Sequence, residues 1–142
     1  MRALVVEDDP TSRQALLHVL ESVGFKVDAA ASVAEAMKLL RPPPDVLILD
    51  LLLPDGSGIE VLRHVRSAAL PTIVALASGA PDATLVETRS LWPDSLFVKP
   101  LELADLRRWL EGVTGRLAEV QEMRQRKLEE QAGQAEGETD CP

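Results

Sequence analysis

The chain has 142 residues, of which 46% are hydrophobic and only 3% aromatic, and its formal net charge at pH 7 is −8. This length suits one domain with an aliphatic core, and the excess of acids argues against a nucleic-acid-binding surface, which needs a basic face. The lone cysteine, Cys141, cannot form an internal disulfide, and no segment resembles a signal peptide or a membrane span. We therefore expect a soluble cytoplasmic protein with no membrane partner.

Short apolar runs alternate with helix-patterned segments along residues 3–111. The apolar runs predict strands at residues 3–6, 25–31, 46–49, 72–77 and 95–98. Apolar residues at helical spacing predict helices at residues 10–23, 33–40, 58–70 and 81–91, and a last helix from about residue 102. Five such alternations predict an α/β domain, with a doubly wound parallel sheet and helices on both of its faces.

Capping residues mark where the first two helices begin and end. Asp9 precedes Pro10, which suits the first helical position, and Ser32 with Glu35 forms a capping box. Gly24 is placed to end the first helix. We therefore interpret Asp9 as a helix cap rather than as a site residue.

One carboxylate stands at the end of the most apolar predicted strand. Residues 46–49 are all apolar and lie between Pro44 and a turn that contains Pro54 and Gly58, which predicts a strand buried on both faces. Asp50 follows directly, although Asp is depleted in strands. Because open α/β sheets bind ligands at the carboxyl ends of their strands, we expect Asp50 to be the centre of the functional site.

Four other polar side chains follow the first, fourth and fifth predicted strands. Glu7 and Asp8 follow the first strand, Ser78 the fourth and Lys99 the fifth, so parallel strands bring them to the same rim as Asp50. Three neighbouring carboxylates repel one another, and Mg²⁺ relieves this repulsion while leaving positions open for a phosphate oxygen. Lys99 offers a positive charge to the same phosphate, which equips Asp50 to accept a phosphoryl group.

The segment 5–10, Asp50 with Pro54 and Gly58 after it, and the dipeptide Lys99-Pro100 together resemble the receiver domain of bacterial two-component response regulators. Each piece is weak alone, but their order and spacing are specific, and they cover roughly residues 1–111. The resemblance implies a flavodoxin-like fold with strand order 2-1-3-4-5. It also implies a phosphorelay protein that takes its phosphoryl group from a histidine kinase or a phosphotransfer protein.

The resemblance further assigns roles to single residues. It implies that Asp50 is the phosphorylated aspartate and that Asp8 and Asp50 bind Mg²⁺ together with the backbone carbonyl of Leu52. It implies that Glu7 acts on the metal directly or through water, and that Lys99 contacts the phosphoryl group. A cis peptide bond after Lys99 is also expected.

Two positions depart from the family pattern. The family usually has Thr or Ser at the end of the fourth strand, to hydrogen-bond the phosphoryl group, and Ala77 stands there, with Ser78 one place later. Ser78 fits a phosphate contact and an ordinary turn equally well. The family's switch aromatic falls at Leu96, with Phe97 next. The acceptor site is thus expected intact, while the usual coupling between the Thr and the aromatic is altered or absent.

The last segment carries an apolar stripe with the 3-4 spacing of a heptad repeat. Its members are Leu103, Leu106, Leu110, Val113, Leu117 and Val120. The stripe then fails, because Arg124 and Lys127 take the next apolar positions. We expect a helical extension over residues 112–132, ending near Glu130, that packs on its own domain or forms a homodimer seam, and a disordered acidic tail over residues 133–142.

Three functions compete for this sequence. The first is a phosphorylation-controlled switch that acts on a downstream protein, since no DNA-binding or enzymatic output segment follows. The second is a degenerate receiver, a constitutive interaction module, which Ala77 and Leu96 favour. The third is an aspartyl-phosphate phosphatase, which needs a second Asp where Leu52 stands. We therefore expect no enzyme beyond self-phosphorylation from small donors and slow autodephosphorylation.

Overall fold

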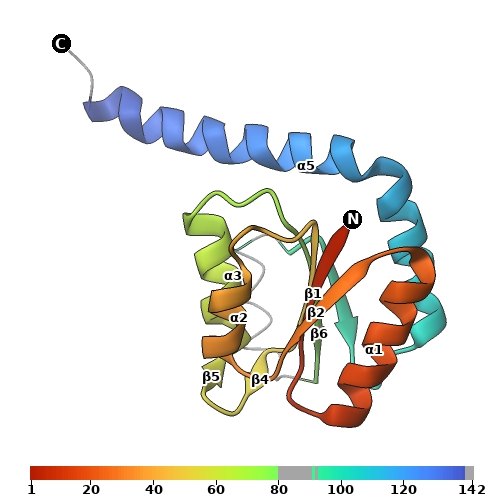
Figure 1. Cartoon of the computed structure of the whole chain (residues 1–142). Coiled ribbons are helices and arrows are strands. Elements are labelled where there is room, and N and C mark those ends of the chain that lie inside the picture. The colour runs from red at the N-terminus through yellow and green to blue at the C-terminus, as the bar shows by residue number, and fades with distance from the viewer. Residues whose placement is uncertain (80–90, 92, 140–142) are drawn as a thin grey trace.

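A computed structural model of the chain describes residues 1–79, 91 and 93–139, and five of its strands form one parallel sheet (Figure 1). The strands are β1 (Arg2–Val6), β2 (Lys26–Ala30), β3 (Val46–Leu49), β6 (Ile73–Ser78) and β7 (Ser95–Val98). Their order is β2-β1-β3-β6-β7, and every pairing is parallel. This is the predicted strand order, counted over these five strands.

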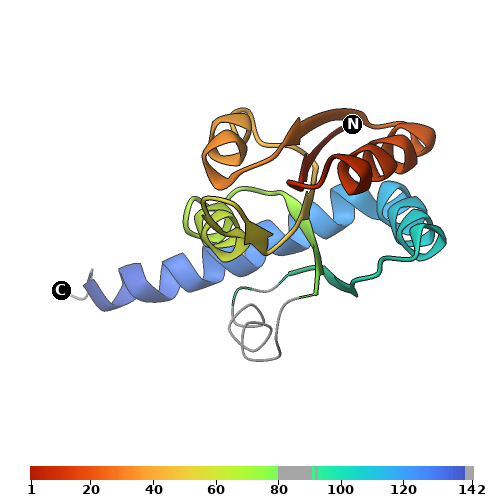
Figure 2. The ribbon, with the colours of Figure 1, turned by 90° about the horizontal axis from the view of Figure 1, so that it is seen from below.

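Helices cover both faces of the sheet, as the alternating pattern predicted. They are α1 (Pro10–Val23), α2 (Val33–Leu39), α3 (Gly58–Ser67) and α5 (Leu103–Thr139). Figure 1 and the view from below in Figure 2 place α2 and α3 on one face and α1 with the start of α5 on the other. The helix expected at residues 81–91 falls mostly outside the described residues.

The core forms two layers because successive strand residues point to opposite faces. Leu47 and Leu49 pack into the layer under α2 and α3, whereas Val46 and Ile48 pack into the layer under α1 and α5. All four residues of β3 are buried. This explains why the central strand is a continuous apolar run rather than an alternating one.

The predicted caps are present and fix how the helices leave the strands. The Asp9 carboxylate accepts a hydrogen bond from the Ser12 amide at 2.8 Å, and Ser32 Oγ accepts one from the Glu35 amide at 3.1 Å. Gly24 ends α1 with a left-handed φ of 106°, which glycine adopts without strain. Each of these signals was local in the sequence, and each places a helix end beside a strand end.

Helix α5 has two halves that meet at Arg116, whose φ of −129° and ψ of 17° are not helical. The first half packs beside α1 and buries Leu106, Leu110 and Val113 in the core of its own domain. The second half turns and runs across the amino ends of the strands (Figure 1). The apolar stripe is therefore used within the domain as far as Leu117.

The end of this helix differs from the expectation. Helix was expected to stop near Glu130 and disorder to begin at residue 133, but α5 continues through Thr139. The added turns are rich in Ala, Gln and Glu, which lose little side-chain freedom in a helix and offset the cost of two glycines, Gly133 and Gly137. No helix in the described part of the chain is long and apolar enough to cross a membrane.

Candidate functional site

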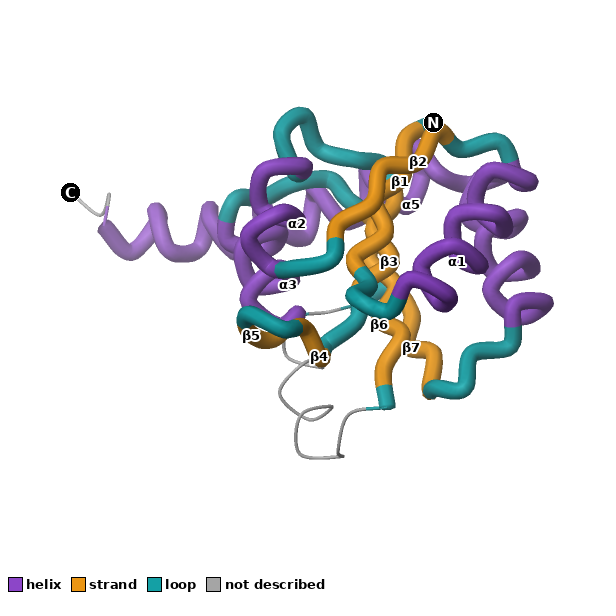
Figure 3. The backbone as a smooth tube through the Cα atoms, turned by 60° about the horizontal axis from the view of Figure 1, so that its bottom comes forward, coloured by secondary structure: helices purple, strands orange, loops and turns teal. Residues whose placement is uncertain are grey.

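The carboxyl edge of the sheet, turned towards the viewer in Figure 3, brings the predicted acids and the lysine together. Glu7 and Asp8 follow β1, Asp50 follows β3, and Lys99 follows β7. Glu7 and Asp50 continue the ladder, because their amides donate to the carbonyls of Ala30 and Val6, each at 3.0 Å. The backbone of the sheet thus sets where both carboxylates begin.

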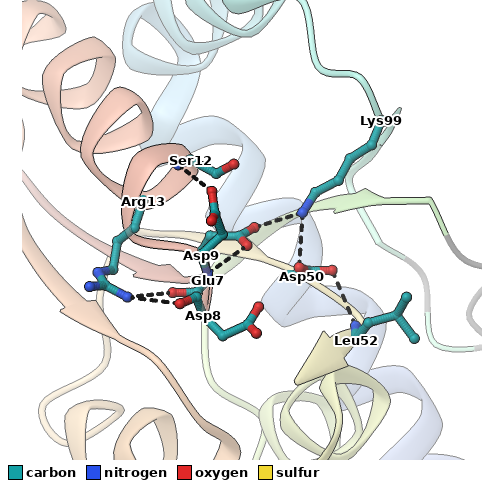
Figure 4. A network of polar contacts seen from close by, with 8 residues as sticks. All are labelled: Glu7, Asp8, Asp9, Ser12, Arg13, Asp50, Leu52 and Lys99. Atoms are coloured by element: carbon teal, nitrogen blue, oxygen red, sulfur yellow. Dashed lines mark hydrogen bonds and ion pairs between the residues drawn. The ribbon is translucent and has the colours of Figure 1, made fainter. Parts of the chain in front are cut away.

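Lys99 bridges the two buried acids (Figure 4). Its Nζ lies 2.8 Å from Glu7 Oε2 and 2.9 Å from Asp50 Oδ2. Glu7 is 1% exposed and Asp50 5%, whereas the Lys99 side chain keeps 32% of its surface in solvent. The lysine therefore reaches from the open side of the site onto two carboxylates fixed at its floor.

Burial and charge act in opposite directions on this trio. Burial raises the pKa of Glu7 above its ordinary value, and the neighbouring Asp50 charge adds to the rise, although the Lys99 hydrogen bond opposes it. Burial alone would lower the pKa of Lys99, but its hydrogen bonds to Glu7 and Asp50 outweigh that effect and raise it. Lys99 thus keeps its positive charge, whereas the charged form of Glu7 is destabilised and would be stabilised by a proton or a cation.

Asp8 completes a group of three acids that suits a hard cation. One carboxylate oxygen each from Glu7, Asp8 and Asp50 lies within 4.8 Å of the others, and Asp8 is exposed. Oxygen ligands with an open side towards water are what Mg²⁺ prefers, because it keeps several of its waters. Buried acids at the floor and an exposed acid at the rim fit such an ion, which Glu7, Asp8 and Asp50 would hold.

The loop after Asp50 is held close to the acceptor. The Leu52 amide donates to Asp50 Oδ1 at 3.1 Å, and β4 (Leu52–Leu53) pairs with β5 (Gly56–Ser57) in a small antiparallel hairpin. A Cβ on Gly58 would lie 2.1 Å from the Asp50 carbonyl oxygen, so only glycine fits there. This contact explains the glycine of the motif. The role of the Leu52 carbonyl in metal binding stays a prediction.

Two residues that shape the site were missed in the sequence. The first is Asp55, in the turn after the acceptor, whose carboxylate accepts from the Val33 amide at 2.8 Å and the Ala34 amide at 3.0 Å. These hydrogen bonds lower the pKa of Asp55. They tie the acceptor loop to the start of α2, and no local signal could reveal them because the partners lie more than twenty residues away.

Arg13 is the second missed residue. Its guanidinium donates to the backbone carbonyls of Glu7 at 3.1 Å and Asp8 at 3.4 Å, one turn into α1 (Figure 4). Because the carbonyls are held from α1, the two acids that follow β1 keep a fixed backbone. The sequence gives no sign of these contacts, because Arg13 is one arginine on a helix that carries both polar and apolar residues.

The two departures from the family pattern are visible in the structure. Ala77 is 2% exposed and lines a cavity of about 320 Å³ together with Glu7 and Lys99. A methyl group thus stands beside the site, at the position where the resemblance leads us to expect a hydroxyl. Ser78 is the last residue of β6 and pairs with Val98, and its contact with phosphate stays a prediction. Leu96 is 36% exposed on β7.

Known proteins resemble this chain in sequence. The model of the response regulator receiver domain matches residues 3–111. The transcriptional regulatory protein AfsQ1 of Streptomyces coelicolor is 36% identical over 100 residues, which span 70% of this chain and 44% of that protein. The phosphate regulon transcriptional regulatory protein PhoB of Escherichia coli is 30% identical over 121 residues, which span 82% of this chain and 53% of that protein. The chain thus spans about half the length of these curated relatives.

Solved structures agree with the fold. A CheY-like receiver domain protein from Methanospirillum hungatei superposes with a TM-score of 0.75 at 25% identity, covering 86% of this chain and 97% of that one. The receiver domain of a LuxO repressor protein from Vibrio parahaemolyticus gives a TM-score of 0.73 at 24% identity, covering 92% and 95%. The cis peptide bond expected after Lys99 is also present.

Proposed function

Because this chain belongs to the response regulator receiver family, we propose that it accepts a phosphoryl group on Asp50 and signals through that modification. The observation that carries the proposal is the trio of Glu7, Asp50 and Lys99 at the carboxyl edge of the sheet, with both Lys99 contacts under 3 Å. A buried acceptor carboxylate beside a fixed cation is the arrangement that phosphoryl transfer requires, since its catalysis is mostly positioning and charge neutralisation.

Each residue of the site has a separate role in the proposed phosphoryl transfer. An Asp50 oxygen forms the new bond to phosphorus while the phosphorus–nitrogen bond of a phosphohistidine breaks, and the electron pair leaves with the imidazole. Lys99 stays protonated and faces the transferred oxygens. When bound, Mg²⁺ would neutralise charge on the phosphoryl oxygens and on the acids. Glu7 and Asp8 hold the negative charge that attracts the ion to this place.

A histidine kinase or a histidine phosphotransfer protein is the proposed donor. Several curated relatives are named transcriptional regulators, and the receiver-domain model covers residues 3–111 of this chain. We propose that the output passes to a downstream protein, without direct contact with nucleic acid. The chain is not proposed to be an enzyme beyond its own phosphorylation and slow dephosphorylation.

A degenerate receiver is the second candidate, and Ala77 supports it. The buried methyl group offers no hydrogen bond to a phosphoryl oxygen, and Leu96 replaces the usual aromatic. In that case the domain would keep its fold and its acids and act as a constitutive interaction module. The intact contacts of Lys99 favour the acceptor over this alternative.

Intact mass separates the two candidates. After incubation with Mg²⁺ and acetyl phosphate, we expect one added phosphoryl group, which Asp50→Asn abolishes and Asp28→Asn keeps. Asp28 is a matched control because it is an exposed carboxylate on β2, away from the site. No added mass in the unmodified protein would make the interaction module the better account. Added mass that persists in Asp50→Asn would place the acceptor elsewhere.

A further inference from the structure

The second half of α5 lies against the amino ends of the strands, on the opposite edge from the acid site (Figure 1). Gln121 Nε2 lies 3.4 Å from Asp45 Oδ1, directly before β3, and Arg124 forms an ion pair with Asp94, directly before β7. Leu117 packs on the core below α1, and Leu128 is buried. Spacings of four, three and four residues place all four side chains on one face of the helix.

Asp94 is the central contact of this edge. Its amide donates to the Val74 carbonyl at 2.8 Å, and its Oδ2 accepts from the Val74 amide at 2.7 Å, so it begins the pairing of β7 with β6. The same carboxylate also pairs with Arg66 at 3.7 Å and with Arg124. These three side chains are only 6–12% exposed. One aspartate therefore joins a strand, α3 and the second half of α5.

From these contacts we propose that residues 117–130 form a reversible clasp, latched by Arg124 on Asp94, whose docking sets the position of β7 and through it of Lys99. Strand β7 has only four residues between Asp94 and Lys99, so a shift at its start reaches the lysine. The non-helical Arg116 supplies the hinge. Two of the four contacts named beyond it, those of Gln121 and Arg124, are polar, which suits an interface that opens and closes.

The clasp offers a route between the site and the rest of the molecule that uses neither residue 77 nor residue 96. If docking of residues 117–130 changes the free energy of binding at Lys99, then binding at Lys99 must change the free energy of docking by the same amount. The consequence for phosphorylation rests on the proposed function, whereas the link between the clasp and β7 does not. The two can therefore be tested separately.

The variant Arg124→Gln tests the latch, with Arg126→Gln as its control, because Arg126 is an exposed arginine on the same helix. Arg66 remains on Asp94 in this variant, so the domain should fold, which unchanged amide protection in β3 would verify. We expect hydrogen exchange of residues 117–130 to accelerate at least tenfold and the backbone amide NMR signals of residues 95–99 to shift. The control should show neither effect.

Several outcomes would overturn the proposal. Unchanged protection of residues 117–130 in Arg124→Gln would remove the latch, and faster exchange without any shift of residues 95–99 would remove the coupling. Leu128→Asn frees the clasp without touching a charge and must give the same shifts, so it decides the matter if Arg124→Gln unfolds. Protection that rises with protein concentration would place the docking between two copies and also overturn the clasp.

Acetyl phosphate and Mg²⁺ extend the test to the acceptor. We expect a several-fold difference in the rate of phosphorylation between Arg124→Gln and Arg126→Gln. Failure of the unmodified chain to gain phosphate would refute the proposed function, and the amide shifts alone would then decide the clasp. Arg124→Gln and Arg126→Gln could differ in amide shifts and yet be phosphorylated at the same rate. That result would show that β7 moves without affecting the acceptor, and it would contradict the proposed effect on Lys99.

Discussion

Both edges of the sheet carry basic side chains paired with carboxylates, but the two groups of pairs have different roles. At the carboxyl edge Lys99 pairs with Glu7 and Asp50, the third acid, Asp8, is exposed, and Lys99 keeps a third of its surface in water. At the amino edge two arginines serve Asp94, and all three side chains are nearly buried. An open site with surplus negative charge can take a cation and a phosphate, whereas a closed site whose charged side chains are buried together serves to hold elements in place.

The pKa values at the two edges reflect this contrast. At the carboxyl edge burial raises the pKa of Glu7, so that site gains from an added cation. At the amino edge burial, together with the charge of Arg124, lowers the pKa of Arg66 to about 10, and Asp94 opposes the fall. Arg66 still carries its charge at neutral pH. The amino edge therefore depends on Asp94 as the partner for buried charge.

The largest expected effect breaks the closed edge. Asp94→Ala would remove the carboxylate that pairs with the buried Arg66 and would remove the start of the β7 pairing. Breaking a buried pair by removing one partner costs about 3–5 kcal/mol. We expect a loss of that size in the free energy of unfolding, measured with urea. Asp105→Ala removes an exposed pair with Arg108 and should lose no more than about 1 kcal/mol. Equal losses in both variants would mean that burial does not distinguish these pairs.

The next effect is a pH dependence at the open edge. Because the folded pKa of Glu7 is raised above 4.5, the folded protein binds this proton more tightly than the unfolded chain does. The stability that Glu7 contributes is thus present below the unfolded pKa and lost as the pH rises through the folded pKa. We expect Glu7→Gln to gain stability relative to the unmodified protein between pH 4 and pH 7 without Mg²⁺.

Urea unfolding at several pH values measures this trend. Asp9 provides the opposite case, because hydrogen bonds from Ser12 lower its pKa, and Asp9→Asn should lose stability relative to the unmodified protein as the pH rises. The difference in free energy of unfolding between Glu7→Gln and the unmodified protein could instead stay constant between pH 4 and pH 7. That result would contradict the view that the negative charge of Glu7 destabilises the open edge.

The smallest effect concerns the helix that joins the two edges. A Cβ on Gly112 would meet no atom within 4 Å, and the residue is helical. Gly112→Ala should therefore raise the free energy of unfolding by about 0.5–1 kcal/mol through helix propensity alone, measured by thermal or urea unfolding. Gly58→Ala is the contrasting variant, since its Cβ would clash with backbone. A loss at Gly112 would mean that this segment needs glycine for the turn towards the clasp.

Much of the fold was predictable because its signals are local. The run 46–49, the caps Asp9 and Ser32 and the glycine after α1 each act within a few residues, and each appears where the pattern placed it. The site was predictable for a related reason. Parallel strands must end on one edge, so the residues after β1, β3 and β7 had to meet, and Glu7, Asp50 and Lys99 do.

The remaining features depend on partners distant in the sequence. Asp55 holds amides at residues 33 and 34, and Arg124 holds Asp94, thirty residues away. The broken heptad stripe looked like a defect at Arg124, yet that position faces inward onto a buried acid. The sequence by itself determined the five-stranded sheet and the identity of its acidic rim, because period, caps and strand ends are local properties. Only the tertiary structure decided that the last helix turns at Arg116 and closes the opposite edge, because that choice depends on which distant carboxylate a buried arginine meets.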